Sequence, residues 1–257
     1  MSITTVGDKF IHYEMLGRGE PLIFVHGWLG SWRYWWPSMQ ALSTHYRTLA
    51  LDLWGFGDSS KSSDSYSLDK YVEMIEQFID QLGIVRPVLL VGHNLGAAVA
   101  LRYAGARPHA VSRLVAVALP VPAYLPNNRL LEGDVAGVLA RVLKVSHPEV
   151  ETELHKTDLA AFNQAAVEVF GTDFGPELVE PAVPTLLVYG NADTMVQYPN
   201  SELAAPAPNR AVVRLDASHF PMLEDTARFN RLILEFMRAE NDPAGVTPKE
   251  FWQRRVH

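Results

Sequence analysis

Apolar runs bounded by turn-forming residues alternate with amphipathic stretches through the first half of the chain. This alternation predicts a parallel β-sheet with helices on both faces, the α/β class. The expected strands are short apolar runs at residues 10–15, 21–26, 46–51, 88–92, 113–119, 185–189 and 211–215.

Two amphipathic helices complete the predicted core. Apolar residues recur at helical spacing between Leu68 and Leu82, with Ser67 as a suitable N-cap and Gly83 as the stop. A second such pattern, from Phe229 to Met237, predicts a helix after the last strand.

The strand pattern disappears between residues 121 and 180, where helical periodicity replaces it. Prolines at 120, 122 and 126 and at 176, 181 and 184 bracket this segment, and proline cannot continue a regular element. We therefore expect a helical cap at 121–180, inserted into a core made of 1–120 and 181–257 after the strand that ends near Leu119.

Composition narrows the class of partner. A chain of 257 residues with 48% apolar residues can form one large domain plus an insertion. Its net charge of −7 comes without a basic cluster, which argues against nucleic acid and anionic lipid as partners. No stretch is apolar enough for a membrane span, and the N-terminus lacks a signal-peptide pattern, so we expect a cytoplasmic protein. A small, uncharged molecule is the expected ligand, and the oligomeric state is left open.

Candidate chemistry follows the ends of the predicted strands. His26-Gly27-Trp28 follows the second strand, and Gly92-His93-Asn94-Leu95-Gly96 joins the fourth strand to a helix. The backbone amides of Trp28 and Leu95 are candidates for an oxyanion hole. Asp193 and His219 follow the last two strands, and open parallel sheets place their sites at this edge.

These motifs, together with the Asp52-Leu-Trp-Gly-Phe-Gly-Asp-Ser segment, resemble those of the α/β-hydrolase superfamily over about residues 10–237. The resemblance implies an α/β-hydrolase fold with a cap, no cofactor, Asp193 as acid and His219 as base. Asn94 occupies the position of the nucleophile. Leu95 and Trp28 differ from the residues usual in dehalogenases, and Leu29 differs from the proline of epoxide hydrolases, so a serine-type parent is favoured.

Asn94 departs from that family pattern, since an amide nitrogen has a delocalised lone pair and cannot make the usual attack on an acyl carbon. Asparagine does tolerate the backbone that such a turn demands. Two origins remain open, a deliberate substitution or a natural lineage that kept the pocket for binding. Deamidation to a carboxylate is a third, and Leu95 disfavours it because an Asn-Gly pair reacts faster.

Further side chains are predicted to line the substrate pocket: His26, Gly27, His93, Tyr124 and Phe220. His147, Glu151 and His155 lie four residues apart on an expected cap helix, where they could present metal ligands. Without a further cluster, a solvated cap face is favoured, and no metal is predicted.

The sequence thus predicts an esterase-like hydrolase of a small ester or related carbonyl compound, impaired because Asn94 replaces the nucleophile. Two alternatives stay open. One is a non-catalytic protein that binds a small molecule in the hydrolase pocket, and the other is a dehalogenase or epoxide hydrolase whose nucleophilic aspartate has become Asn94.

Overall fold

The computed structural model describes residues 2–121, 147–205, 207–239 and 246. Its centre is a sheet with the strand order β1-β2-β4-β3-β5-β6-β7-β8. The strands are β1 Ser2–Val6, β2 Lys9–Leu16, β3 Pro21–Val25, β4 Arg47–Leu51, β5 Val88–His93, β6 Val111–Val117, β7 Thr185–Gly190 and β8 Arg210–Leu215.

The sheet is parallel from β4 to β8, as the sequence predicts, whereas β1 and β2 are antiparallel. Every residue of β3, β5 and β7 is buried, because strands covered on both faces require continuous apolar runs. β1 is absent from the predicted strands. It alternates between exposed and part-buried positions at the sheet edge and has no apolar run to mark it.

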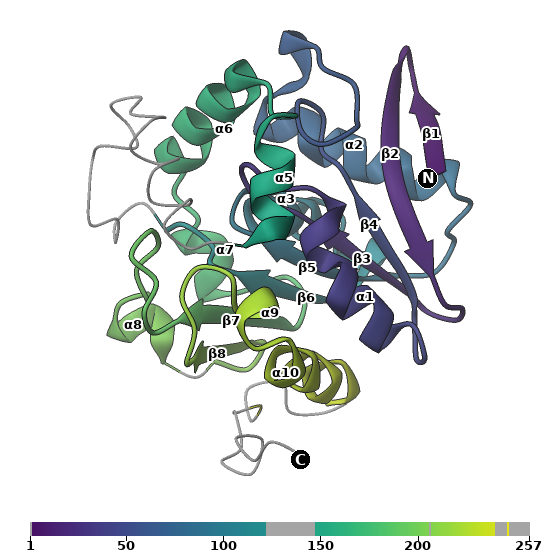
Figure 1. Ribbon diagram of the computed structural model, residues 1–257. Coiled ribbons are helices and arrows are strands. Elements are labelled where there is room, and N and C mark those ends of the chain that lie inside the picture. Colours follow the sequence, from purple (N-terminus) through teal and green to yellow (C-terminus); the bar gives the residue numbers. More distant parts are fainter. Residues whose placement is uncertain (1, 122–146, 206, 240–245, 247–257) are drawn as a thin grey trace.

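Helices cover both faces of this sheet (Figure 1). Helix α1 packs with α10 on one face, and α2 packs with α3 on the other. The described α-helices are α1 Trp36–Leu42, α2 Leu68–Gln81, α3 Leu95–Ala106, α5 Pro148–Leu154, α6 Leu159–Gly171, α7 Gly175–Val179, α8 Ser201–Ala204, α9 Pro221–Glu224 and α10 Thr226–Arg238. Short 3-10 helices are η1 Trp32–Trp35, η2 Ser63–Ser65 and η3 Pro108–Ala110.

The predicted cap is described from residue 147 onward, where α5, α6 and α7 follow one another. Helix α5 contacts η1, and α6 contacts α2 and α3, so these helices lie over the core (Figure 1). Residues 122–146, with the helical pattern expected there, lie outside the described residues. None of the helices in the described ranges has the length and apolar character that a bilayer crossing needs.

Candidate active site

Asn94 sits at a sharp turn between β5 and α3. Its backbone has φ 50° and ψ −111°, a region that few residues other than glycine adopt. The turn is tight because its glycines admit no side chain. A Cβ on Gly96 would lie 2.3 Å from the Val25 carbonyl oxygen, and one on Gly92 would lie 2.3 Å from that of Gly96. The strand and the helix therefore approach closely, and the turn projects residue 94 from the end of the strand.

The structure brings Asn94, Asp193 and His219 together from three separate loops. His219 Nδ1 lies 2.9 Å from Asp193 Oδ2, and His219 Nε2 lies 3.3 Å from Asn94 Nδ2. An ionised carboxylate can only accept hydrogen bonds. The proton of the imidazole is therefore on Nδ1, and the Nδ1–H group donates a hydrogen bond to Asp193. Nε2 then carries a lone pair, which accepts from the Asn94 amide N–H.

The Asp193 side chain is fully buried, and its charge is balanced locally. Burial opposes ionisation, but His219 and the amides of Val196 and Met195 outweigh it and lower the pKa of Asp193. These two amides donate to Oδ1 at 3.0 and 2.7 Å. Asp193 is therefore a fixed carboxylate at neutral pH, and it orients the imidazole.

The predicted oxyanion donors lie on either side of the elbow. Leu95 opens α3 directly after Asn94. Trp28 follows Gly27, whose Cα lies so near the elbow that an added Cβ would be 2.8 Å from Asn94 Cβ. Within the described parts of the chain, neither amide has a hydrogen-bond acceptor. Both N–H groups thus remain available for a developing negative charge.

A buried network that the sequence did not reveal links the loops that carry Gly27, His93 and His219. The Gly27 N–H donates to the Tyr34 hydroxyl. That hydroxyl lies 3.2 Å from His93 Nδ1, and His93 Nε2 lies 3.0 Å from the His219 carbonyl oxygen. Burial and the neighbouring His219 lower the pKa of His93, which favours a neutral ring. A neutral imidazole protonated at Nε2 satisfies both bonds, since Nδ1 accepts from the Tyr34 hydroxyl and Nε2–H donates to the His219 carbonyl. His93, predicted as a pocket residue, is fully engaged in holding the loops.

His26 is likewise engaged with backbone groups. Its Nδ1–H donates to the Gly27 carbonyl at 2.8 Å, and its Nε2 accepts from the Leu53 N–H at 2.9 Å. The side chain is fully buried, and burial lowers its pKa. This geometry favours a structural role over the predicted place in the substrate pocket.

Aromatic rings lie near Asn94, Asp193 and His219, which we call the relay. The Trp28 ring lies 5.0 Å from Phe170 and 6.0 Å from Phe162, both on α6. Phe220, a predicted pocket residue, packs edge-to-face against the His219 ring, with the ring centroids 5.0 Å apart. Tyr124, the remaining predicted pocket residue, lies outside the described residues. The surroundings suit an apolar ligand.

His147 is a correction to the predicted solvated cap face. Its ring lies 5.4 Å from Phe220 and its side chain is 16% exposed, whereas Glu151 and His155 are exposed as expected. The three side chains therefore do not share one solvated face.

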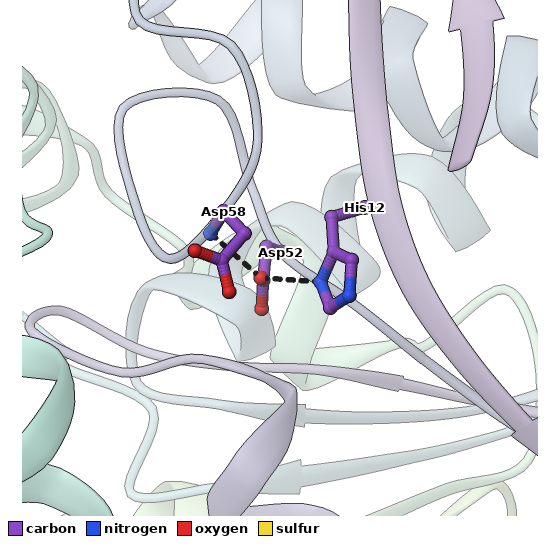
Figure 2. A group of neighbouring side chains, drawn as sticks. All are labelled: His12, Asp52 and Asp58. Carbon is purple, nitrogen blue, oxygen red and sulfur yellow. Dashed lines mark hydrogen bonds and ion pairs between the residues drawn. The ribbon is translucent and has the colours of Figure 1, made fainter. Parts of the chain in front are cut away.

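A second polar cluster, formed by His12, Asp52 and Asp58, brings three groups that could ligate a metal within 4.8 Å (Figure 2). Their atoms already have protein partners. Asp52 Oδ2 accepts from His12 Nδ1 at 2.8 Å and from the Asp58 N–H at 3.0 Å, and Asp58 Oδ2 accepts from Lys156 at 2.8 Å. Burial lowers the pKa of His12, but the hydrogen bond to the Asp52 carboxylate and its charge outweigh burial and raise that pKa. A cationic ring beside the carboxylate is therefore favoured.

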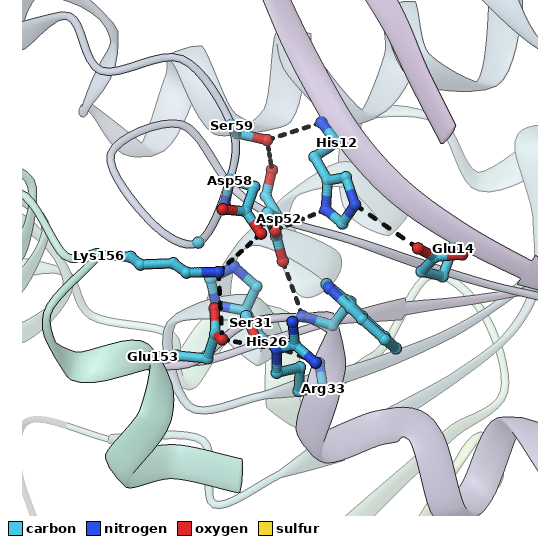
Figure 3. A network of polar contacts seen from close by, with 12 residues as sticks. His12, Glu14, His26, Ser31, Arg33, Asp52, Asp58, Ser59, Glu153 and Lys156 are labelled. Atoms are coloured by element: carbon cyan, nitrogen blue, oxygen red, sulfur yellow. Dashed lines mark hydrogen bonds and ion pairs between the residues drawn. The ribbon is translucent and has the colours of Figure 1, made fainter. Parts of the chain in front are cut away.

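That cluster extends to α5 and fastens the helix to the core (Figure 3). Glu153 has a fully buried side chain, and its Oε1 lies 2.6 Å from Arg33 Nε and 3.4 Å from Lys156 Nζ. Lys156 also pairs with Asp58. Because every charge meets an opposite one, we interpret the cluster as a structural tie.

Comparisons with known proteins identify the fold family. Residues 20–143 match the α/β hydrolase fold family. The chain is 28% identical to a pimeloyl-[acyl-carrier protein] methyl ester esterase of Aeromonas salmonicida, over 88% of this chain and 99% of that one. It is also 28% identical to a dihydrolipoyllysine-residue acetyltransferase component of the acetoin cleaving system of Pseudomonas putida, over 91% of this chain and 68% of the relative.

Among solved structures, a hydrolase from Pseudomonas aeruginosa superimposes with a TM-score of 0.79 at 25% identity, covering 93% of this chain and 98% of that one. Family, topology and relatives lead to one assignment. The chain belongs to the α/β-hydrolase superfamily.

Proposed function

We propose that this chain is a hydrolase of a small ester or related carbonyl compound, built to act through residue 94, His219 and Asp193, and that it is impaired because Asn94 replaces the nucleophile. One observation carries the proposal. His219 Nε2, oriented by Asp193, faces residue 94 at 3.3 Å, where a nucleophile would need a base. The methyl ester esterase among the relatives supports an ester as the substrate class.

A serine at position 94 would complete the chemistry. Its hydroxyl would attack the acyl carbon while His219 Nε2 takes the proton, and the amides of Trp28 and Leu95 would stabilise the oxyanion. His219 would then return the proton to the leaving alcohol, and water would release the acid. The Asn94 amide can neither attack nor form this acyl-enzyme.

The test compares the parent chain with Asn94→Ser on a panel of short-chain aryl esters. We expect the serine form to hydrolyse at least one ester about 10³-fold faster, since removal of a triad member costs 10³ or more. The double variant Asn94→Ser/His219→Ala is the matched control, and it should return to the parent rate. Equal turnover by the parent and the serine form would reject the proposal.

An aspartate parent makes a different prediction. If the lineage used a carboxylate nucleophile, Asn94→Asp rather than Asn94→Ser would gain turnover, with alkyl halides or epoxides as substrates. Measuring both variants on all three substrate classes separates the two origins.

The second candidate function is the binding of a small molecule without catalysis. It rests on the side-chain oxygen of Asn94, which accepts no hydrogen bond from the described residues. This atom, Oδ1, is buried, so a ligand donor could satisfy it. Carbonyl compounds carrying a hydroxyl or amide N–H would then raise the melting temperature of the parent chain with no product formed. Asn94→Ala should reduce that shift, and an unchanged shift would reject this role.

A further inference from the structure

Glu224, the last residue of α9, directs its carboxylate to the backbone on both sides of His219. Oε2 accepts from the Ser218 N–H at 2.6 Å, and Oε1 accepts from the Phe220 N–H at 3.1 Å. The Ser218 hydroxyl donates to Oε1 as well. Only 23% of the side chain's area remains exposed, although the residue as a whole lies at the surface.

These bonds leave His219 little freedom. The residues before and after it are held by one carboxylate, and its own carbonyl oxygen is held by His93 at 3.0 Å. The imidazole must meet both Asp193 and position 94, and its direction depends on this short backbone segment. A displacement of about 1 Å at such a site can cost on the order of 10²-fold in rate.

Ser218 gains a role from the same contacts. Glycine is frequent at the position before the histidine in the superfamily that the sequence resembles, and glycine has no hydroxyl to donate. Here the Ser218 hydroxyl adds a third donor to the carboxylate. Charge-assisted bonds of this kind are stronger than bonds between neutral groups.

The carboxylate also meets the predicted cap. His147, which precedes α5, has Nε2 at 3.8 Å from Glu224 Oε1, too far for a hydrogen bond but within ion-pair distance when the imidazole is protonated. The His147 ring packs on Phe220. Glu224 therefore lies between residues 216–220, which we call the histidine loop, and His147 of the predicted cap.

We propose that Glu224 is a positioning residue, whose carboxylate fixes the backbone on both sides of His219 and so holds the imidazole between Asp193 and position 94. The proposal rests on the proposed function only in taking His219 as the base. The fixed geometry of the loop can be measured without any turnover.

The test in the parent chain is NMR of the His219 imidazole in protein labelled with ¹⁵N-histidine, assigned by comparison with His219→Ala. Glu224→Ala should weaken the Nδ1–H signal bonded to Asp193 and shift both ring nitrogens. Ser218→Ala removes one donor only and should move the same signals less. Asp225→Asn is the control, because Asp225 caps α10 through the Arg228 N–H and is not bonded to the histidine loop.

In the Asn94→Ser background, Glu224→Ala should lower kcat about 10- to 10²-fold with KM nearly unchanged. A lower melting temperature with unchanged His219 signals would overturn the proposal and make Glu224 a purely structural residue. If Glu224→Ala does not fold, Ser218→Ala decides by the same signals. If Asn94→Ser shows no turnover, the proposed function fails. The NMR result still tests the clamp, that is, the hydrogen bonds from the backbone on both sides of His219 to the Glu224 carboxylate.

Discussion

Asn94 separates two requirements that a nucleophile elbow normally combines. The turn needs a residue that tolerates φ 50°, and asparagine meets that need. The reaction needs an atom that can be deprotonated and attack, which an amide lacks. A single substitution at position 94 can therefore remove the nucleophile while the turn and the surrounding hydrogen bonds are retained.

Tyr34 provides a prediction at this scale. Tyr34→Phe removes a fully buried hydroxyl and leaves the Gly27 N–H and His93 Nδ1 unpaired. Each buried group left without a partner costs about 1–3 kcal/mol, so we expect a loss of roughly 2–4 kcal/mol in urea unfolding. Tyr13→Phe is the control, since the Tyr13 hydroxyl has no partner among the described residues. Equal losses in both variants would show that the network contributes nothing.

The relay residues were predictable and the groups that hold them were not. Asn94, Asp193 and His219 each follow a strand of recognisable apolar character, and parallel strands bring their carboxyl ends to one edge. Tyr34 and Glu224 act through hydrogen bonds to loop backbone, whose directions depend on turns that no periodicity encodes. The sequence predicted His26 and His93 as pocket residues, and the hydrogen-bond partners that each has in the structure could not be inferred from it.

At the scale of elements, the close approach of β3, β5 and α3 defines the elbow. Gly96→Ala would place a Cβ 2.3 Å from the Val25 carbonyl oxygen, and backbone cannot move aside cheaply. We expect a loss of more than about 2 kcal/mol, as overpacking commonly costs 1–3 kcal/mol or more. Gly105→Ala in the same helix has nothing within 4 Å, and it should be neutral or gain up to about 1 kcal/mol. Similar effects of the two substitutions on urea unfolding would contradict this packing.

Central strands were predictable from the sequence because each is a continuous buried run. β1 was missed because an edge strand with exposed positions lacks that run, and the antiparallel pairing of β2 depends on a short hairpin that shows no apolar signal. The cap boundaries at 121 and 180 remain a prediction, although the described part from α5 to α7 is helical.

Helix α5 depends on one buried carboxylate. Glu153→Gln keeps the shape of the side chain but leaves Arg33 without its anionic partner, while Lys156 retains only Asp58. The two cations are about one third exposed, so water compensates part of the loss, and the cost is smaller than the roughly 3–5 kcal/mol of a fully buried pair. We expect hydrogen exchange in α5 to be faster than in the parent chain, with exchange in β5 unchanged. Glu149→Gln, a less buried change in the same helix, is the control. Unchanged exchange in α5 would show that the helix is held by its apolar contacts alone.

For the whole molecule, the pH dependence of stability should report the carboxylates that hold the histidine loop. Burial opposes ionisation of Glu224, but His147, Ser218 and Phe220 lower its pKa from 4.5 to about 2. Asp193 is shifted in the same direction. A folded pKa below the unfolded value means that the unfolded chain takes up protons first as the pH falls. The stabilisation is therefore complete above about pH 4.5 and is lost as the pH falls toward 2.

Glu224→Gln removes this proton linkage, so its free energy of unfolding should differ most from the parent's near pH 7 and approach it below pH 4.5. Urea unfolding at pH 7, 5, 4 and 3 measures that difference directly. Asp193 titrates in both proteins, so its contribution cancels in the comparison unless the two carboxylates are coupled through His219. A difference that stays constant from pH 7 to pH 3 would mean that the Glu224 carboxylate gains nothing from its donors in the folded state, and the clamp on the histidine loop would then have no electrostatic basis.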